Sequence, residues 1–420
     1  MKKKVKILDI YNILIAGACL MPFSMLCGIF FLNLNIILFD IIFLFTLKKD
    51  QIVNFFNKNK ILITLLGVFF IANILFSIDR NISIHAFFGI IKHLILIAGF
   101  YKVINFKYLK SIFNPILLAC LLFVLLNIFL QIFFGNDIFG NVITGNYRST
   151  AVFGSPKAGS YIVKFFFLIL VCNFLLNNKN YTFFYLSLFT IGIILTNGRM
   201  VTIIAIFFST IYLLLYKDFF FKKCIKVVFF LFLCACAVFL PIKNGKNSEN
   251  RSVSENLIGR TQSQFSSSSD NFSIKNLEWY QHYFLSYKIF LERPIIGSGI
   301  KTFRIYCPKI REKNYATKTY SCSTHPHHAY LEILAEGGLF GLTIFLYFLF
   351  KIFFQFVKIY IYNPKSRIEI LPMFIFFFAN MQPFQIMGSF FSSYAGFFYF
   401  FSIMVSLVFV AQYANSKNLK

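Results

Sequence analysis

Long runs of apolar residues, separated by short polar stretches, recur along nearly the whole chain. A helix needs about 20 apolar residues to cross the roughly 30 Å hydrocarbon core of a bilayer, and about twelve runs approach that length. They cover residues 9–26, 29–47, 61–78, 84–101, 111–134, 159–176, 181–197, 200–216, 224–241, 338–357, 369–388 and 391–412. The first run follows Met-Lys-Lys-Lys but has no clear small-x-small cleavage site, so we interpret it as an uncleaved first helix.

The composition agrees with a membrane location. Hydrophobic residues make up 58% of the chain and charged residues only 13%, whereas soluble domains are nearer half apolar and a quarter charged. We therefore expect an all-α polytopic membrane protein with about twelve transmembrane helices.

The basic residues, which give the chain a formal net charge of +26, fall in alternate connections. They crowd the N-terminal tail, the connections near residues 48–60, 102–110, 179, 217–226 and 351–367, and the C-terminal tail. The short connections on the other side carry only Arg80, Arg148, Lys157 and Arg199. Because positive charge marks the cytoplasmic side, both termini are predicted to be cytoplasmic. Most of the basic excess is then a topology signal, and we expect no nucleic-acid partner.

One outer connection, from Pro241 to Gly337, is large enough to form a site of its own. We divide the chain accordingly into membrane helices 1–9 (residues 1–240), this large outer segment (241–337) and membrane helices 10–12 (338–420). The segment begins with a stretch rich in serine and asparagine, which is typical of a loosely ordered loop.

The later part of the outer segment has a helical pattern. "LEWYQHYFLSYKIFLERP" predicts an amphipathic helix on the outer membrane surface that ends before Pro294. The positions expected on its apolar face are Trp279, Tyr283, Ser286 or Tyr287, and Phe290. The only tryptophan suits the membrane interface. The glycines of "GSG", Gly297 and Gly299, then predict a sharp turn.

The outer segment is basic without a topological reason. Residues 241–324 contain thirteen basic and six acidic residues, a net charge of +7. This charge would suit an anionic head group, because arginine binds phosphate oxygens in pairs; a merely soluble surface is the alternative. Arg148 and Arg199 lie in short outer connections where an unpaired charge is costly, so we interpret them as functional. Snorkelling to lipid phosphates is the other possibility.

Two of the nine cysteines, Cys307 and Cys322, lie in the outer segment. A disulfide between them would be stable in an oxidising compartment, although neither thiol need be paired. The other cysteines fall mostly inside apolar runs, where they are expected to be small buried residues.

Half of the six histidines crowd into "STHPHHAYLEILAEGG". Pro326 predicts a helix that starts near His327 and ends at Gly337-Gly338. On that helix one face would carry His328, Glu332 and Glu336, and another would carry His327, Tyr330, Leu331 and Leu334. A neutral imidazole there is a reasonable general base. Two alternatives stay open: a zinc site that uses Cys322, His325 and His327 or His328, with Cys307 as a weak fourth ligand, and ordinary interfacial polar residues.

Four motifs resemble those of the O-antigen ligase and polymerase superfamily and occur in the family's order. They are "YRSTAVFGSP", "LTNGRMVTIIAI", "WYQHYFLSYKIFLERPIIGSGIKTF" and "HPHHAYLEILAEGGLFGL". The resemblance covers residues 147–342 and implies a glycosyltransferase of the GT-C type with one large periplasmic loop between spans 9 and 10. It also implies a donor glycan linked to undecaprenyl diphosphate, reaction at the periplasmic face of the bacterial inner membrane, and no metal or other cofactor.

The resemblance also implies roles for individual residues. Arg148, Arg199, Arg260 and Lys275 are the candidates for binding the diphosphate, and His327 is the candidate base. Trp279, Gly297, Gly299 and Glu336 would support the site. The chain departs from the family where Lys275 and Arg293 replace the more usual Arg and His, where Gly198 and Met200 flank Arg199, and where His328 replaces the usual Asn. Either His327 or His328 could therefore be the base.

We expect an O-antigen ligase, which transfers lipid-linked polysaccharide to lipid A-core with inversion. An O-antigen polymerase uses the same donor but a second lipid-linked unit as acceptor; the single large late loop favours the ligase. A transporter, which would need charged or broken helices in mid-membrane, is a more distant alternative. Asp40, Lys92 and Lys164 lie inside predicted spans and keep it open, but they are isolated from one another in the sequence.

Overall fold

The fold was analysed in a computed structural model of the 420-residue chain. It describes residues 2–58, 60–143, 148–175, 181–215, 220–243, 250–256, 258–259, 277–314, 322–362, 367–383 and 388–416. Most of these residues are helical.

Most helices of the N-terminal half overlap the predicted apolar runs, whereas residues 49–58, 106–108 and 151–153 are helical between the runs. They are α1 (Lys2–Cys19), α2 (Met21–Leu26), α3 (Ile29–Thr46), α4 (Lys49–Lys58), α5 (Lys60–Leu75), α6 (Arg80–Val103), α7 (Phe106–Tyr108), the π-helical turn η1 (Leu109–Phe113), α8 (Asn114–Phe134), the 3₁₀ turn η2 (Ala151–Phe153), α9 (Ala158–Leu175), α10 (Thr182–Leu195), α11 (Arg199–Leu215) and α12 (Phe220–Val238). Pro22 lies near the start of α2 and separates it from α1 within the first predicted run, because proline suits the first turn of a helix.

The outer segment and the C-terminal helices complete the fold. They comprise β1 (Pro241–Lys243), β2 (Asn250–Ser252), α14 (Glu278–Glu292), α15 (Phe303–Asn314), α16 (Ala329–Tyr362), α17 (Arg367–Met381) and α18 (Ala395–Ser416). The antiparallel pair β1–β2 is the one departure from the expected all-α fold among the described residues. A helix therefore lies within each of the twelve predicted runs.

Four described helical stretches are long and apolar enough to cross a membrane by length and composition. They are α3, α6, residues 111–134 and α16; the other apolar helices are shorter. The chain is thus a helical membrane protein.

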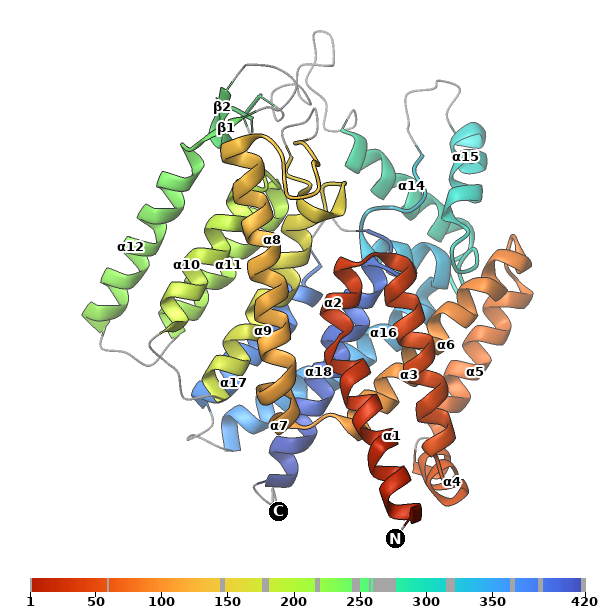
Figure 1. Cartoon of the computed structure of the whole chain (residues 1–420). Helices are drawn as coiled ribbons and strands as arrows, with labels where there is room; N and C mark the ends of the chain where they lie inside the picture. Colours follow the sequence, from red (N-terminus) through yellow and green to blue (C-terminus); the bar gives the residue numbers. More distant parts are fainter. Residues whose placement is uncertain are drawn as a thin grey trace.

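The helices form one bundle in which α9 is central. Every residue from Tyr161 to Leu170 is buried, as expected for a helix that is surrounded on all sides. Helix α17 packs against α9 and α18, and α18 packs against α6 and α16. Figure 1 shows α10, α11 and α12 on one side and α3, α5 and α6 on the other, with α16 between them.

The two ends of the bundle differ. Helix α1 begins and α18 ends at one end, as an even number of crossings requires, whereas β1, β2, α14 and α15 lie at the opposite end (Figure 1). We call this opposite end the outer end. The described residues of the sequence motifs lie in connections and helix ends at the outer end.

Candidate functional site

Helix α16 is kinked at Gly338, where φ is 65° and ψ is −167°. The kink lies at the predicted boundary between the outer segment (241–337) and the tenth span. The helix nevertheless continues through the kink to Tyr362. A kink leaves backbone groups without helical partners, and in a membrane each such group is costly. Another part of the chain must therefore satisfy them.

The turn after α14 supplies these partners. Four backbone hydrogen bonds join it to the kink: Ser298 N to Ala335 O (3.0 Å), Gly299 N to Glu336 O (3.1 Å), Leu339 N to Pro294 O (2.8 Å) and Phe340 N to Ile295 O (3.1 Å). The backbones approach so closely that a Cβ on Gly297 would lie 2.4 Å from the Glu336 carbonyl, and one on Gly338 would lie 2.4 Å from the Ile295 oxygen. The predicted "GSG" turn is thus a backbone clasp on α16.

The same turn is also hydrogen-bonded to side chains of α5 and α6. Asn73 donates to the carbonyls of Ile296 (2.8 Å) and Glu336 (2.9 Å) and accepts from the Ile300 N–H (3.0 Å). Ser83 donates to the Ile300 carbonyl at 3.1 Å. A Cβ on Gly299 would lie 2.1 Å from Ser77 Oγ, so only glycine fits there.

The two acidic residues of the histidine motif are buried and bonded to backbone N–H groups. Glu336 accepts from Lys301 N (2.6 Å) and Phe303 N (2.9 Å), at the start of α15. Glu332 accepts from Phe390 N at 2.6 Å and from the Ser389 hydroxyl. A carboxylate at the N-terminus of a helix stabilises that helix. Glu336 therefore holds the start of α15 against α16.

Cys307 and Cys322 form a disulfide. It joins α15 to the segment that carries the histidines. Cys307 also belongs to a small buried apolar cluster with Leu285, Ile289, Phe303, Ile310 and Ala335. Bonded sulfurs cannot act as thiolate ligands, so the zinc alternative, which needed Cys322, is wrong. In the described part of the chain no three His, Cys, Asp or Glu side chains are placed to hold a metal ion.

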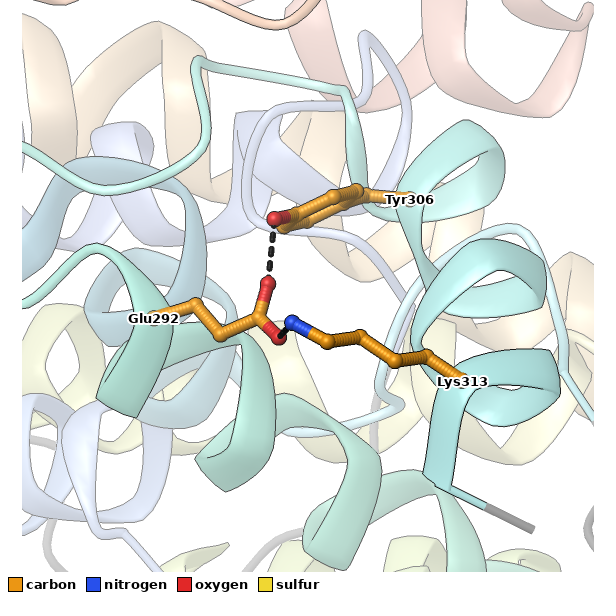
Figure 2. Close-up of polar contacts among 3 residues, drawn as sticks. All are labelled: Glu292, Tyr306 and Lys313. Carbon is orange, nitrogen blue, oxygen red and sulfur yellow. Dashed lines mark hydrogen bonds and ion pairs between the residues drawn. The ribbon is translucent and has the colours of Figure 1, made fainter.

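A polar contact also joins α14 to α15 at the surface (Figure 2). Glu292 accepts from the Tyr306 hydroxyl and from Lys313 Nζ at 2.9 Å. These two hydrogen bonds lower the pKa of the Glu292 carboxyl, the Tyr306 bond most. The contact is largely exposed, so it orients the helices more than it stabilises the fold.

Helix α14 packs one face against α15 and α16. The buried residues are Gln281, His282, Leu285, Ser286 and Ile289. Of the positions predicted at the membrane surface, Trp279 and Tyr287 are exposed and Ser286 is buried. The i, i+3, i+4, i+7 spacing from His282 is the signal that could have found this histidine in the sequence.

The histidine segment starts α16 later than predicted. His327 has a left-handed backbone, with φ at 59°, and is not helical. His328 caps the helix instead: its Nδ1 accepts from Leu331 N at 3.3 Å and its carbonyl accepts from Glu332 N at 2.9 Å. The predicted face that included His327 therefore does not exist, because the helix begins at Ala329.

Two other imidazoles lie close to His327. Its ring centroid lies 4.1 Å from that of His325 and 5.5 Å from that of His282 on α14. Burial, followed by the charges of His327, His282 and Arg304, lowers the pKa of His325 to about 4. His325 is therefore neutral at physiological pH.

The ring of His328 holds the start of α16. Its Nδ1 accepts from Leu331 N at 3.3 Å. Burial lowers the pKa of His328, and the backbone of His328 and Pro383 opposes this shift.

Arg148 and Arg199 interact electrostatically although they are far apart in sequence. Burial, followed by the charge of Arg199, lowers the pKa of Arg148. Arg199 is the first residue of α11, and a helix N-terminus favours anions. Gly198, which replaces the family's serine, leaves room for Val201: a Cβ there would lie 2.6 Å from Val201 Cγ2.

The Arg148 loop is held by one buried glutamine of α8. Gln131 accepts from Ser149 Oγ (2.7 Å), Thr150 N (3.1 Å) and Ala151 N (3.0 Å), and donates to Thr150 Oγ1 (2.8 Å). The backbone on either side of Arg148 is therefore tied to the bundle. Nothing in the sequence pattern singled out Gln131.

Backbone strain marks each of the four motifs. The described residues other than glycine with positive φ are Ala151, Asn197, Lys301 and His327, at 42°, 57°, 64° and 59°. Each lies within or beside one of the motifs. Such residues are uncommon and gather at functional sites, so all four motifs hold backbones in fixed, unusual conformations.

The structure brings the predicted residues into two groups. One contains Arg148 and Arg199; the other contains His327, His328, Glu336 and the turn with Gly297 and Gly299. They are linked through α17, which packs against α9 and α11 and leads to Pro383 beside His328. Arg260 and Lys275 lie outside the described residues, and Trp279 is exposed on α14.

Comparison with known proteins identifies the segment that carries most of this site. Residues 183–346 match the family model described as O-antigen ligase. No curated protein matches the chain. The matched segment contains the Arg199 turn, α14, α15, the clasp on α16 and the histidines, while Arg148 precedes it. The match over residues 183–346 thus supports the resemblance to the O-antigen ligase superfamily.

Proposed function

We propose that this protein is an O-antigen ligase. It transfers polysaccharide from undecaprenyl diphosphate to lipid A-core at the periplasmic face of the inner membrane, and it has about twelve membrane-spanning helices in a GT-C-like arrangement. The observation that carries the proposal is the match of residues 183–346 to the O-antigen ligase family. The electrostatic interaction between Arg148 and Arg199 supports a site for the donor diphosphate.

The arginine pair suits the leaving group. Two neighbouring guanidinium groups repel each other, and a diphosphate relieves this repulsion while accepting paired hydrogen bonds from each. The negative charge that develops on the diphosphate as the glycosidic bond breaks is then stabilised by groups already in place. Arg260 and Lys275 are further candidates for the same diphosphate.

His327 is the proposed base. His328 acts instead as the cap of α16, because its Nδ1 accepts from Leu331 N. The departure from the family at position 328 is then a change of helix cap, since asparagine caps helices equally well. His327, with neutral His325 at its side, remains to take a proton.

The reaction follows from these positions. An acceptor hydroxyl attacks the anomeric carbon from the face opposite the diphosphate, and the bond from that carbon to the diphosphate oxygen breaks. The hydroxyl proton passes to a ring nitrogen of His327. Attack from the opposite face inverts the anomeric configuration, and the arginines supply the positive charge that the leaving group needs.

The competing functions predict different acceptors or none. A polymerase would use the same donor site with a lipid-linked unit as acceptor, and the single large outer segment favours the ligase. A transporter would need charged or broken helices in mid-membrane. Of the charged residues inside predicted spans, Lys92 donates to Asn33 and Lys164 donates to the Asn380 carbonyl, whereas Asp40 accepts no hydrogen bond from a described residue.

Deletion of the gene tests this proposal. We expect a gel of the lipopolysaccharide to show core without long chains while lipid-linked polymer accumulates, and the plasmid-borne gene to restore the chains. Core that carries a single repeat would instead identify a polymerase. Full-length lipopolysaccharide in the deletion strain would exclude both.

A further inference from the structure

We propose that His282 of α14 is a positioning residue for the transfer reaction. Its ring holds the ring of His327 in the orientation in which His327 takes the proton of the acceptor hydroxyl. This inference rests on the proposed function, in which His327 is the base. His282 lies within the third sequence motif, but the sequence pattern assigned no role to it.

The backbone of His327 is fixed on both sides. Before it, the disulfide between Cys307 and Cys322 joins the histidine segment to α15. After it, the His328 carbonyl accepts from Glu332 N at 2.9 Å as α16 begins. The left-handed backbone of His327 lies between these two anchors. A side chain on such a backbone still has several rotamers, so the direction of the His327 ring depends on its neighbours.

Two rings restrict these rotamers. The ring centroid of His325, in the same segment, lies 4.1 Å from that of His327, and the two ring planes are inclined by 52°. The ring centroid of His282 lies 5.5 Å from that of His327, with an inclination of 37°. Rings with centroids up to about 7 Å apart are in contact. His327 thus has one ring neighbour from its own segment and one from a separate helix.

His282 is held in place by the packing of α14. Its side chain is only 2% exposed. Leu285 and Ile289, which follow at helical spacing, are buried in one apolar cluster with residues of α15 and α16. At the end of α14, Glu292 accepts two hydrogen bonds from side chains of α15 (Figure 2). A ring on a helix anchored in this way is a firm neighbour for a functional side chain.

The residue after His282 makes a matching contact. The ring of Tyr283 lies 5.1 Å from that of His328 in an edge-to-face arrangement. Two consecutive residues of α14 therefore meet two consecutive histidines of the segment. Because both contacts depend on the same alignment, α14 cannot slide along the histidine segment without losing both.

The orientation of His327 matters because a proton is transferred only over a short distance. A general base must lie within about 2.6–3.2 Å of the atom that carries the proton, and a misplacement of about 1 Å can lower a rate about 100-fold. His282 and His325 restrict the His327 ring before the substrate binds. His282 acts on the reaction only through His327, which makes it a positioning residue.

Steady-state kinetics of the full-length protein in nanodiscs test the proposal, with undecaprenyl-diphosphate-linked polysaccharide as donor and lipid A-core as acceptor. His282→Ala removes the ring, whereas His282→Phe keeps a flat ring at the contact. Tyr287→Ala removes an exposed ring from the same helix and is the matched control. Where the alanine variant does not fold, His282→Leu fills the volume without a flat ring and carries the same expectation.

We expect His282→Ala to lower kcat about 10-fold to 100-fold while both KM values stay unchanged, because ground-state binding does not use the His327 ring. His282→Phe and Tyr287→Ala should keep kcat within about threefold of the wild type. An unchanged kcat in His282→Ala, a change confined to KM, or a phenylalanine variant as slow as the alanine variant would overturn the proposal.

NMR of isotope-labelled histidine separates this inference from the proposed function. The chain has only 6 histidines, and His327→Asn identifies the His327 signal. We expect one sharp His327 signal in the wild type and a shifted and broadened one in His282→Ala, with the signal of His93, which stacks on Phe400, unchanged. Identical His327 signals in both proteins would refute the positioning role. An altered His327 signal in a protein that transfers nothing to lipid A-core would refute the transferase function alone.

Discussion

We propose different roles for the two adjacent histidines. His327 has a strained left-handed backbone and a ring beside two other imidazoles. His328 precedes α16 and caps it, with Nδ1 accepting from Leu331 N. Asparagine can replace each without disturbing the backbone, because it tolerates positive φ at 327 and caps helices at 328.

We therefore expect His327→Asn to lower the transfer rate by about 10²–10⁴-fold, the loss typical of a general base. His328→Asn should keep most of the activity. Both variants should reach the membrane at wild-type level, which immunoblotting of the membrane fraction checks. Loss of activity in His328→Asn with normal activity in His327→Asn would reverse the two roles.

At the scale of elements, the turn after α14 and the kink of α16 form one unit. Gly297 has a φ of 80° and lies against the Glu336 backbone, which cannot move aside as a side chain could. The four backbone hydrogen bonds between the turn and α16 depend on this close approach.

Gly297→Ala should destabilise the protein by about 2 kcal/mol or more, from positive-φ strain and overlap with the helix. We expect a lower melting temperature in detergent and weaker transfer. Gly67→Ala on α5 is the matched control, since nothing lies within 4 Å of its added Cβ. A wild-type melting temperature for Gly297→Ala would show that the clasp can relax.

The sequence predicted the elements better than their contacts. Apolar runs located the helices because each run must bury itself in lipid or protein whatever its neighbours are. The start of α16 was wrong by two residues because Pro326 gave only a boundary, whereas the left-handed backbone of His327 depends on packing. The positions of Gln131 and His282 depend on hydrogen bonds and contacts between distant segments, which no local pattern records.

At the scale of the molecule, the bundle gathers β1, β2, α14 and α15 at its outer end, away from the end where α1 begins and α18 ends (Figure 1). This arrangement and the match of residues 183–346 to the O-antigen ligase family support the proposed donor, acceptor and base. Composition alone predicted a membrane protein but not this arrangement.

The central claim is transfer from a lipid diphosphate to lipid A-core, and reconstitution tests it most directly. Purified protein, undecaprenyl-diphosphate-linked polysaccharide and lipid A-core are combined in liposomes, and the product is followed by gel and mass spectrometry. We predict polysaccharide joined to core and stoichiometric release of undecaprenyl diphosphate, both lost in Arg199→Ala. Polymer that lengthens only on the lipid diphosphate, or no product from folded wild-type protein, would contradict the account.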